Sequence, residues 1–547
     1  MSLHKDLSPL GRIRAAYVPA LPSILKDLAT LKVVEKNEKE KSFNTELNAL
    51  FPFTYSQPFL EFTQSLSQSF VPLKVGVVFS GGQASGGHNV ISGLLDALLK
   101  LNAKSCLMGF LDGPKGIVEN KYITIDLDNM ASYRNQGGFD LIGSGRTKIE
   151  TTQQFEAIEK NVRALGLDGL VIIGGDDSNT NAAFIAEYFK QKNLKTSVVG
   201  VPKTIDGDLQ NEFIEISFGY DTACKIYSEF IGNLAKDALS AKKYYFFVKM
   251  MGRSASHVAL ECAIKTQINL ALIGEEIADL KMTLKQVIDT IVNLICQRAS
   301  VGKNYGVILI PEGIIEFISE FKVLLVELNR LHAEIEKADE NKLERISQLL
   351  TPLSARCLND LPANFQKQLL FDRDPHGNIQ VSKIETERLI IQLVEQELIK
   401  RKNEQGFQGE FNAQPLFCGY EGRSGLPSNF DCHYCYSLGH LAAVLVNSQM
   451  SGYMACINKL DKNVEQWEIC GTPITRMLHL EQRKGKMTAV IQKGLVNLKG
   501  KLFKFYQSKK SSWMLEDAYL CPGPIQYEGE REITEAPPLI LNFIEKK

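Results

Sequence analysis

The sequence predicts an α/β protein with mostly parallel sheets. From residue 73 onward, short apolar runs alternate with amphipathic helical segments, and several of the runs end in glycine-rich turns. Strands that alternate with helices are typical of parallel sheets covered by helices on both faces. Because 547 residues are too many for one simple core, we expect two Rossmann-like three-layer α/β/α domains, an N-terminal extension and a helical insertion.

The first set of elements begins at residues 74–79, whose apolar side chains indicate a buried strand. A turn rich in glycine and serine follows at 80–87, and residues 88–101 then place their apolar side chains on one helical face. Further strands, with helical segments between them, are expected near 105–110, 168–173 and 196–201.

A second set of elements repeats this alternation. Helices are expected near 254–267 and 283–299. The expected strands lie near 243–250, 269–273 and 304–310. Residues 316–405 are instead helical and highly charged, as at 324–348 and 384–402, and this composition indicates a helical insertion. The heptads are not sustained, which argues against a coiled coil.

These patterns divide the chain into five predicted segments. The first, 1–72, is an N-terminal extension with helical patterning at 45–53 and 58–70. After the insertion, α/β patterning resumes near Leu416 and continues through 451–457. The remaining predicted segments are 73–240 for the first α/β domain, 241–315 with 406–470 for the second, 316–405 for the insertion and 471–547 for a C-terminal segment.

The overall composition is that of a soluble globular protein, with 44% hydrophobic and 23% charged residues. A net charge of −1 gives no global attraction to nucleic acid or to an acidic membrane.

The 11 cysteines are scattered, which favours free thiols. Cys432 and Cys435 form one close pair, but a zinc site needs two more ligands, and His440 supplies one at most. The start of the chain has no apolar core of a signal peptide, and no apolar run approaches a membrane span of about 20 residues, so we expect a cytoplasmic protein.

Two segments carry most of the chemistry, GGDDSN at 174–179 and PKTIDGD at 202–208. Each follows an apolar strand-like run, so we expect the two strand ends to lie at one sheet edge. Together they contain four aspartates, a lysine and two hydroxyl groups. This combination suits a magnesium ion, an anionic phosphoryl donor and a hydroxyl group that must lose a proton.

Each of these segments also has an ordinary interpretation. Adjacent carboxylates repel one another, so Asp176 and Asp177 suggest a cation, but Asp177, Ser178 or Asn179 could equally be the N-cap of the next helix. Asp206 lies on the same side of an extended segment as Thr204 and could accept a hydroxyl proton. The alternative is that Asp-Gly-Asp forms an acidic turn.

Five further loops combine glycine with charge at predicted strand ends. Taken singly, each reads as a turn with an exposed charge, but ligands of open α/β sheets bind at the carboxyl ends of strands. The loops are GGQASGGHN from Gly81, GSGRT with Arg146, MMGR ending at Arg253, PEG with Glu312, and GYEGR ending at Arg423.

In order and spacing, these motifs between about 74 and 423 resemble the phosphofructokinase superfamily. The resemblance implies magnesium-dependent phosphoryl transfer to the 1-hydroxyl of fructose 6-phosphate. It also implies that 73–240, with later segments returning to it, binds the donor, and that 241–315 with 406–470 binds the sugar phosphate.

Two departures from the ATP-using pattern indicate the donor. Asp177 and Lys203 stand where the ATP enzymes usually carry glycine, and Tyr420 stands where many of them have histidine. With these residues the chain resembles the pyrophosphate-dependent branch of the family. Its length, N-terminal extension and helical insertion resemble the long form of that branch, which includes the plant catalytic β subunit and its bacterial relatives. A carboxylate at 177 adds bulk and negative charge where the α-phosphate of a nucleotide would lie, whereas a lysine at 203 can bind diphosphate. The ATP-dependent enzyme and a non-catalytic regulatory subunit remain the alternatives.

The resemblance also implies roles for individual residues. Asp206 is the expected base, Asp176 the magnesium ligand, and Gly82 with Lys203 the diphosphate site. Asp177, Lys203 and Arg146 are expected to act beside Asp206 in catalysis. Because the family completes its sugar-phosphate site from a neighbouring subunit, Lys243 and Tyr244 imply a homodimer with a shared site. The full expected set for fructose 6-phosphate is Thr204, Ile205, Asp206, Lys243, Tyr244, Met251, Gly252, Arg253, Glu312, Tyr420, Glu421, Gly422 and Arg423.

Overall fold

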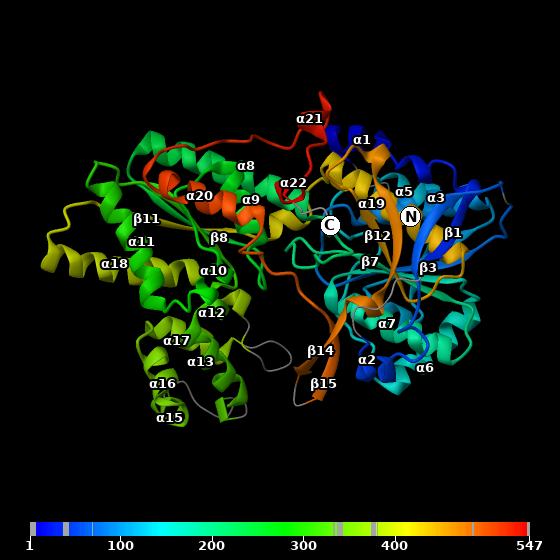
Figure 1. Cartoon of the computed structure of the whole chain (residues 1–547), viewed down its shortest axis with the longest axis horizontal. Coiled ribbons are helices and arrows are strands. Elements are labelled where there is room, and N and C mark those ends of the chain that lie inside the picture. The colour runs from blue at the N-terminus through cyan, green and yellow to red at the C-terminus, as the bar shows by residue number, and fades with distance from the viewer. Residues whose placement is uncertain are drawn as a thin grey trace. The chain divides into compact units, whose positions relative to one another are not determined.

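The computed structural model describes residues 7–36, 43–67, 69–331, 334–335, 343–372, 379, 381–483 and 486–543. The chain passes back and forth between two compact units, whose elements are labelled in Figure 1. Unit 1 comprises Met1–Ala223, Glu421–Gly494 and Ile525–Asn542. Unit 2 comprises Cys224–Tyr420, Leu495–Pro524 and Phe543–Lys547. The segment 406–470, assigned above to one domain, is therefore divided between the units after residue 420.

Unit 1 is built on a nine-stranded sheet in the order β1-β2-β13-β12-β7-β6-β3-β4-β5. Its centre, from β12 to β4, is parallel, and both edges are antiparallel. The strands are β1 (Leu31–Lys36), β2 (Phe59–Gln64), β3 (Lys74–Ser80), β4 (Cys106–Phe110), β5 (Tyr122–Ile125), β6 (Gly169–Gly174), β7 (Ser197–Pro202), β12 (Tyr453–Asn458) and β13 (Glu468–Pro473). A separate hairpin pairs β14 (Leu478–Arg483) with β15 (Lys486–Ile491).

Helices cover both faces of this sheet. Leu170 and Ile172 of β6 lie in one core cluster with residues of α6 (Thr152–Leu165) and α7 (Asp176–Gln191). Side chains alternate along a strand, and a Cβ on Gly169 would touch Val446 of α19 (Asn429–Asn447), so α19 covers the other face. The other helices of this unit are α1 (Pro9–Ala16), α2 (Thr45–Leu50), α3 (Gly87–Leu101), α4 (Pro114–Glu119), α5 (Leu127–Ala131), α21 (Arg531–Thr534) and α22 (Leu539–Asn542).

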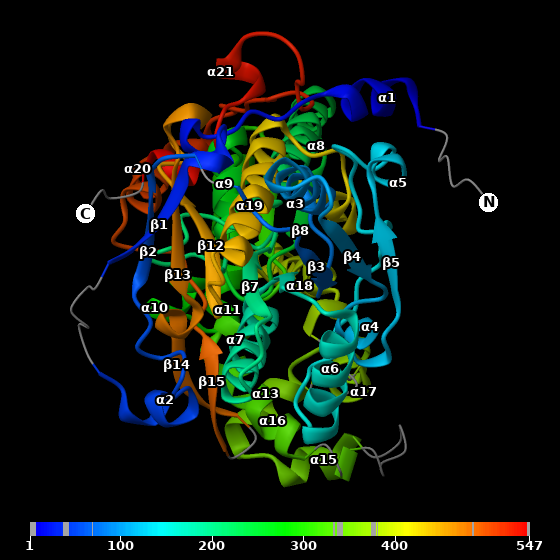
Figure 2. The same ribbon diagram turned by 90° about the vertical axis from the view of Figure 1, so that its right-hand side faces the viewer.

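Two glycines let helices α3 and α19 pack side by side, as Figure 2 shows. A Cβ on Gly93 would lie 2.3 Å from the Tyr436 carbonyl oxygen, and a Cβ on Gly439 would lie 2.2 Å from that of Val90. Since real Cβ atoms do not approach so closely, larger residues at either position would push the helices apart.

The N-terminal extension corrects one prediction. The helix predicted at 45–53 is present as α2, but the helical prediction for 58–70 is wrong, because the centre of that segment forms strand β2. Leu60 and Phe62 are buried whereas Glu61 and Thr63 are exposed, which is the two-residue period of a strand. Residue 68 of that segment lies outside the described residues.

Unit 2 contains a four-stranded, all-parallel sheet in the order β11-β8-β10-β9. Its strands are β8 (Tyr245–Met250), β9 (Leu270–Ala271), β10 (Gly306–Pro311) and β11 (Ala413–Cys418). Its helices include α9 (His257–Thr266), α10 (Gly274–Asp279), α11 (Leu284–Ala299), α12 (Ile314–Phe317) and α20 (Lys501–Leu515), and α8 (Tyr220–Ala241) begins in unit 1 and continues here.

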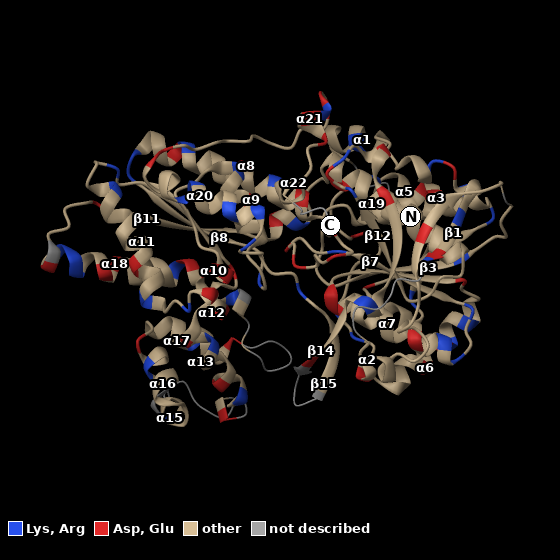
Figure 3. Cartoon of the chain, in the orientation of Figure 1, with Lys and Arg blue, Asp and Glu red and all other residues tan. Residues whose placement is uncertain are grey.

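The segment predicted as a helical insertion is helical and packs on this sheet. Its described helices are α13 (Ser319–Arg330), α15 (Leu343–Leu349), α16 (Pro352–Asn359), α17 (Ala363–Phe371) and α18 (Thr386–Gln405). One core cluster joins Ile308 of β10 with Phe321, Phe365 and Val394 of these helices. Within the segment 324–348, predicted as helical, α13 ends at Arg330 and α15 begins at Leu343, and residues 332–333 and 336–342 between them lie outside the described ranges. Figure 3 shows that both signs of charge are spread over the insertion helices.

The predicted α/β class with mostly parallel sheets is confirmed. All 11 cysteines are free thiols, and none of the described His, Cys, Asp and Glu side chains form a group of three or more that could hold a metal ion. In the described part of the chain, no helix combines the length and apolar character that a membrane crossing requires. The cytoplasmic location stays a prediction.

Candidate active site

Three neighbouring strands of unit 1 end level with one another. Ser80 of β3 pairs with Gly174 of β6, and Gly174 pairs in turn with Pro202 of β7. The loop after β3, the start of α7 and the loop after β7 therefore begin side by side at the carboxyl edge of the sheet. This is the edge where open α/β sheets bind ligands.

The glycine loop after β3 leaves room for two cationic side chains. A Cβ on Gly81 would lie 3.3 Å from Lys203 Nζ, and a Cβ on Gly82 would lie 3.5 Å from Arg423 Cζ. Gly81 also has a φ of 92°, in the region that favours glycine. Its N–H donates to the Gly145 carbonyl at 2.9 Å, which ties the loop to the segment that carries Arg146.

Asp176 is the first residue of α7, and Gly175 is the N-cap. The alternative in which Asp177, Ser178 or Asn179 caps this helix is therefore wrong. Burial raises the pKa of the Asp176 carboxyl above its usual range; Lys493 opposes this shift, and the negative charges of Asp177 and Asp208 add to it. A buried carboxylate with acidic neighbours favours a bound cation.

Lys203 is buried at the centre of a charged cluster. Burial lowers the pKa of its ammonium group to about 8. The carboxylates of Asp206 and Asp176 raise this pKa, while the guanidinium groups of Arg423 and Arg146 lower it. These interactions place the predicted magnesium ligand, base and diphosphate lysine in one cluster with both arginines. Such a cluster of basic groups suits a ligand that carries several negative charges.

The predicted base Asp206 lies in a tight turn of the loop after β7. Its N–H donates to Thr204 Oγ1 at 3.1 Å, and Ser217 Oγ donates to the Thr204 carbonyl at 2.9 Å. Gly207, with a φ of 74°, then turns the chain so that Asp208 is buried. Ile205 is also buried. Asp206 is only half-buried, so of the carboxylates of Asp206 and Asp208, that of Asp206 is the more accessible.

Asp177 forms an ion pair with Lys148, which no motif contains. Its Oδ1 lies 3.4 Å from Lys148 Nζ, and both side chains are about half exposed. The strongest charged neighbours of Lys203 are instead Asp206, Arg423, Asp176 and Arg146. The selection of the donor by Asp177 and Lys203 stays a prediction.

Unit 2 gathers another predicted group at the carboxyl ends of its strands. The Gly252 N–H donates to Glu312 Oε2 at 3.3 Å, and the Glu312 N–H donates to the Met250 carbonyl at 2.8 Å. Gly252 has a φ of 127°. A Cβ on Gly313 would lie 1.8 Å from the Arg253 carbonyl oxygen, so the two loops touch through backbone atoms. Met251 is buried and Arg253 is exposed beside it.

Two of the remaining predicted sugar-phosphate residues lie apart from this group. Lys243 and Tyr244 precede β8, at its amino end, whereas Met251 follows its carboxyl end. A strand of six residues spans about 20 Å, so these two groups lie at opposite edges of the sheet. Tyr420 follows the carboxyl end of β11, which pairs with the carboxyl end of β8, and is 68% exposed. Glu421, Gly422 and Arg423 belong to unit 1.

Sequence reasoning missed Lys493, which follows β15. Its Nζ lies 3.7 Å from Asp176 Oδ2 and 3.5 Å from Asp208 Oδ2. No motif surrounds this lysine, and about 285 residues separate it from the loop after β7, so no local signal identified it. Both carboxylates therefore lie near the same ammonium group.

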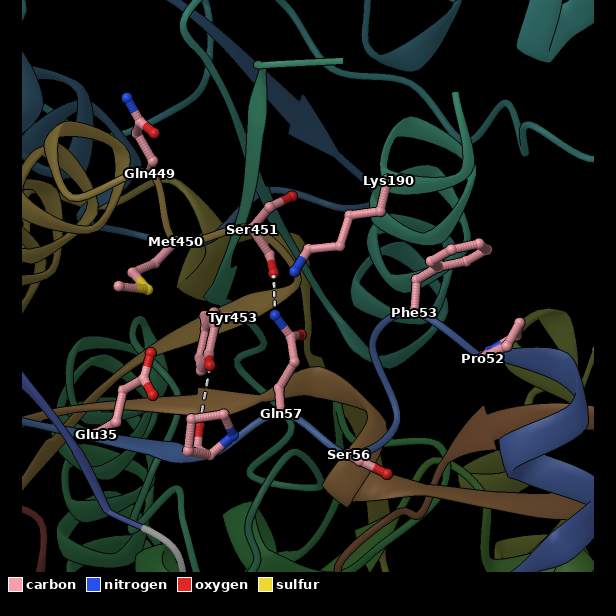
Figure 4. A pocket seen from close by; sticks show the side chains of 11 residues that line it. Glu35, Pro52, Phe53, Ser56, Gln57, Lys190, Gln449, Met450, Ser451 and Tyr453 are labelled. Carbon is pink, nitrogen blue, oxygen red and sulfur yellow. Dashed lines mark hydrogen bonds between the residues drawn. The ribbon is translucent and has the colours of Figure 1, made fainter. Parts of the chain in front are cut away.

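A surface hollow of about 300 Å³ in unit 1 is not the candidate site (Figure 4). Gln449, Met450 and Ser451 line it just before β12, which places the hollow at the amino ends of the strands. Of its eleven lining residues, Glu35 and Lys190 are the charged ones. Such a lining offers no clustered positive charge to a phosphorylated substrate.

The chain belongs to the phosphofructokinase family, whose model matches residues 74–446. It is 51% identical to the pyrophosphate–fructose 6-phosphate 1-phosphotransferase subunit beta 1 of Arabidopsis thaliana, over 93% of this chain and 90% of that protein. It is 45% identical to the pyrophosphate–fructose 6-phosphate 1-phosphotransferase of Treponema pallidum, over 98% of this chain and 97% of that protein. The resemblance to the long pyrophosphate-dependent branch is confirmed.

A solved structure of low sequence identity shares the fold. The pyrophosphate-dependent phosphofructokinase of Nitrosospira multiformis superposes with a TM-score of 0.54 at 13% identity, over 87% of this chain and 99% of that chain. At this identity the likeness concerns the fold alone.

Proposed function

We propose that the protein transfers a phosphoryl group from diphosphate to the 1-hydroxyl of fructose 6-phosphate, giving fructose 1,6-bisphosphate and phosphate. The observation that carries the proposal is the buried Lys203 among Asp176, Asp206, Arg146 and Arg423. Full-length relatives of both plant and bacterial origin that bear this activity in their names support it. Because a phosphoanhydride is exchanged for a phosphate ester without the larger driving force of a nucleotide, the reaction runs in both directions.

Each group of the cluster has a role in this reaction. Asp206 takes the proton of the sugar hydroxyl as that oxygen attacks the diphosphate. Lys203 and the backbone amides at Gly82 bind the diphosphate, and Arg146 spreads positive charge over the transferred group. Arg423, predicted to bind the sugar phosphate, lies beside Gly82, so the phosphate that it contacts is bound next to the glycine loop.

Asp176 is the proposed magnesium ligand, with Asp208 beside it. The support is that both carboxylates lie within 3.7 Å of the ammonium group of Lys493, which is itself a cation. Magnesium binds through one or two carboxylates together with substrate phosphates, so no larger cluster of ligands is needed. A bound ion would neutralise charge on the phosphoryl oxygens.

The sugar phosphate is the proposed ligand of Met251, Gly252, Arg253 and Glu312 in unit 2. Glu312 accepts the Gly252 N–H and is buried, which fixes the loop whose exposed Arg253 is available to a phosphate. Bidentate arginine contacts are well suited to phosphate groups. Tyr420, Glu421 and Gly422 complete the proposed set.

The test of donor choice is product formation by the purified protein with diphosphate or ATP as sole donor. We expect fructose 1,6-bisphosphate from diphosphate and essentially none from ATP. Lys203→Gly should lower kcat/KM for diphosphate by about 10- to 100-fold, because a charged hydrogen-bonding group is lost. Lys148→Gly, which removes a half-exposed lysine, is the matched control and should change it less than about 3-fold. Robust ATP use without diphosphate use would overturn the proposal.

The two alternatives predict other outcomes in the same assay. An ATP-dependent enzyme would use ATP in the unmodified protein, whereas we expect ATP use to appear, if at all, after Asp177→Gly. A non-catalytic regulatory subunit would be inactive alone and active after addition of a second chain. The presence of Asp176, Asp206 and Arg253 argues against such a subunit.

We further propose a homodimer in which Lys243 and Tyr244 complete the sugar-phosphate site of the other copy. The support is their position at the amino end of β8, at the opposite edge of the sheet from Arg253. Within one chain, these residues cannot bind the same small phosphate ester as Arg253.

Mixing two inactive variants tests this arrangement. Lys243→Ala and Arg253→Ala should each lower kcat/KM for fructose 6-phosphate by at least about 10-fold as homodimers. After denaturation and refolding together in equal amounts, about a quarter of the sites should be intact, because half of the dimers are then mixed and each has one intact site. Recovery no greater than the average of the separate variants would contradict the shared site.

A further inference from the structure

Lys493 lies close to two carboxylates of the cluster, those of Asp176 and Asp208. Its Nζ lies 3.7 Å from Asp176 Oδ2 and 3.5 Å from Asp208 Oδ2. The side chains of Asp176, Asp208 and Lys493 are 24%, 9% and 30% exposed, so water screens these charges only in part. Asp176 and Asp208 repel one another, and the ammonium group offsets that repulsion.

The backbone on both sides of Lys493 is fixed to the elements that carry these carboxylates. The Ile491 N–H donates to Thr180 Oγ1 of α7 at 3.1 Å, and the Gly494 N–H donates to the Asp208 carbonyl at 2.7 Å. A Cβ on Gly494 would lie 2.5 Å from the Gln210 carbonyl oxygen. The close approach therefore needs glycine at 494, and two backbone hydrogen bonds, one on each side, hold Lys493 at the site.

The ammonium group lies farther from these two carboxylates than a charge-assisted hydrogen bond requires. Charge-assisted N–H···O bonds are about 2.7–2.9 Å long, whereas both distances here are longer. By comparison, the Arg134–Asp96 pair of the same unit closes to 2.6 Å. The ammonium group is thus near enough to neutralise the two carboxylates and is not locked to either, so another cation can displace it.

We propose that Lys493 is a tethered counterion that competes with free divalent metal for Asp176 and Asp208. When metal arrives together with diphosphate, the flexible lysine side chain moves to the diphosphate oxygens and contributes to binding. Lys493 is thereby a positioning residue that couples metal binding to diphosphate binding. This inference rests on the proposed function, because it takes diphosphate as the anion.

The test is a titration with Mn²⁺ as the probe metal, followed by its electron paramagnetic resonance signal, on the full chain without substrates. Lys493→Met removes the competing charge with little loss of bulk and should tighten Mn²⁺ binding by about 10-fold. Lys493→Arg keeps a positive charge and should leave the affinity within about 3-fold of the parent. Lys148→Met removes a positive charge near Asp177 at a more exposed position and should change the affinity less than about 2-fold.

A second titration, with methylene diphosphonate as a non-hydrolysable diphosphate analogue, tests the coupling. In the parent protein the analogue should tighten Mn²⁺ binding, and in Lys493→Met this enhancement should fall by at least about 5-fold. Equal Mn²⁺ affinities in the parent and Lys493→Met, or no Mn²⁺ binding by either, overturn the proposal. Circular dichroism confirms that each variant is folded. Metal binding requires no turnover, so a chain that binds Mn²⁺ as expected but makes no product would refute the proposed function and not this inference.

Discussion

Replacing Asp206 with serine is expected to lower kcat by about 10²–10⁴-fold while leaving KM for fructose 6-phosphate within a few-fold, because a positioned base contributes this much to proton transfer. The Asp206 carboxylate is half-buried in a turn fixed by Thr204 and Ser217, so it is ready to accept a proton without rearrangement. Initial rates over a range of fructose 6-phosphate concentrations separate kcat from KM.

The pH of this assay matters because the Asp206 carboxylate also changes the pKa of Lys203. Burial lowers the pKa of Lys203 to about 8, and the Asp206 carboxylate raises it. Serine at 206 removes that favourable charge, so the pKa of Lys203 falls further and less of the ammonium form remains at pH 8. Rates are therefore best compared near pH 6.5, where Lys203 stays protonated in both proteins, so that the loss reports on the base.

Asp206→Asn is the matched control, since it keeps the size of the side chain and removes its ability to take a proton. Both variants should lose activity alike. A loss of only a few-fold in either would show that another group accepts the proton.

Most of the candidate site could be predicted because its residues follow strands. Parallel strands bring their carboxyl ends to one edge whatever their order along the chain, and here Ser80, Gly174 and Pro202 lie in register. Asp176, Lys203 and Asp206 could therefore be placed together from strand ends and turn glycines. The same reasoning failed for Lys493, which follows a two-stranded hairpin outside the sheet and is brought to the site by backbone hydrogen bonds that leave no mark in the sequence.

The less certain parts of the fold were those with weak or competing periodicity. The helical prediction for 58–70 overlooked strand β2, because the two-residue alternation of Leu60 and Phe62 extends over only the six residues Phe59–Gln64. Asp177 and Lys203 were singled out together as the residues that select the donor, and the structure gives Asp177 the neighbour Lys148, from a loop that the motifs did not connect to it. Opposite charges in neighbouring motifs do not specify which side chains meet, since rotamers and burial decide that.

Lys249 and Glu387 join strand β8 to helix α18 inside unit 2, and breaking this pair is expected to destabilise the unit strongly. Lys249 Nζ lies 3.2 Å from Glu387 Oε2, donates to the Ile384 carbonyl at 3.2 Å and lies 4.6 Å from the Phe417 ring centroid. The two side chains are 5% and 8% exposed. Lys249→Met leaves the Glu387 carboxylate buried beside an apolar side chain, which costs about 3–5 kcal/mol in the free energy of unfolding.

Urea unfolding in a Trp467→Phe background measures this effect, because Trp513 of α20 is then the only tryptophan and reports on unit 2. Lys285→Met is the matched control: Lys285 lies 2.7 Å from Asp289 in the same unit but is 71% exposed, so its loss should cost less than about 1 kcal/mol.

The double variant Lys249→Met/Glu387→Leu distinguishes a buried charge from lost packing. With both charges removed, no carboxylate is left unpaired, and most of the stability should return, because apolar pairs of similar volume often match a buried ion pair. If the double variant is as unstable as Lys249→Met, the loss comes from the packing of the lysine chain on Phe417 and from its hydrogen bond to Ile384. In that case, the ion pair does not hold the insertion to the sheet.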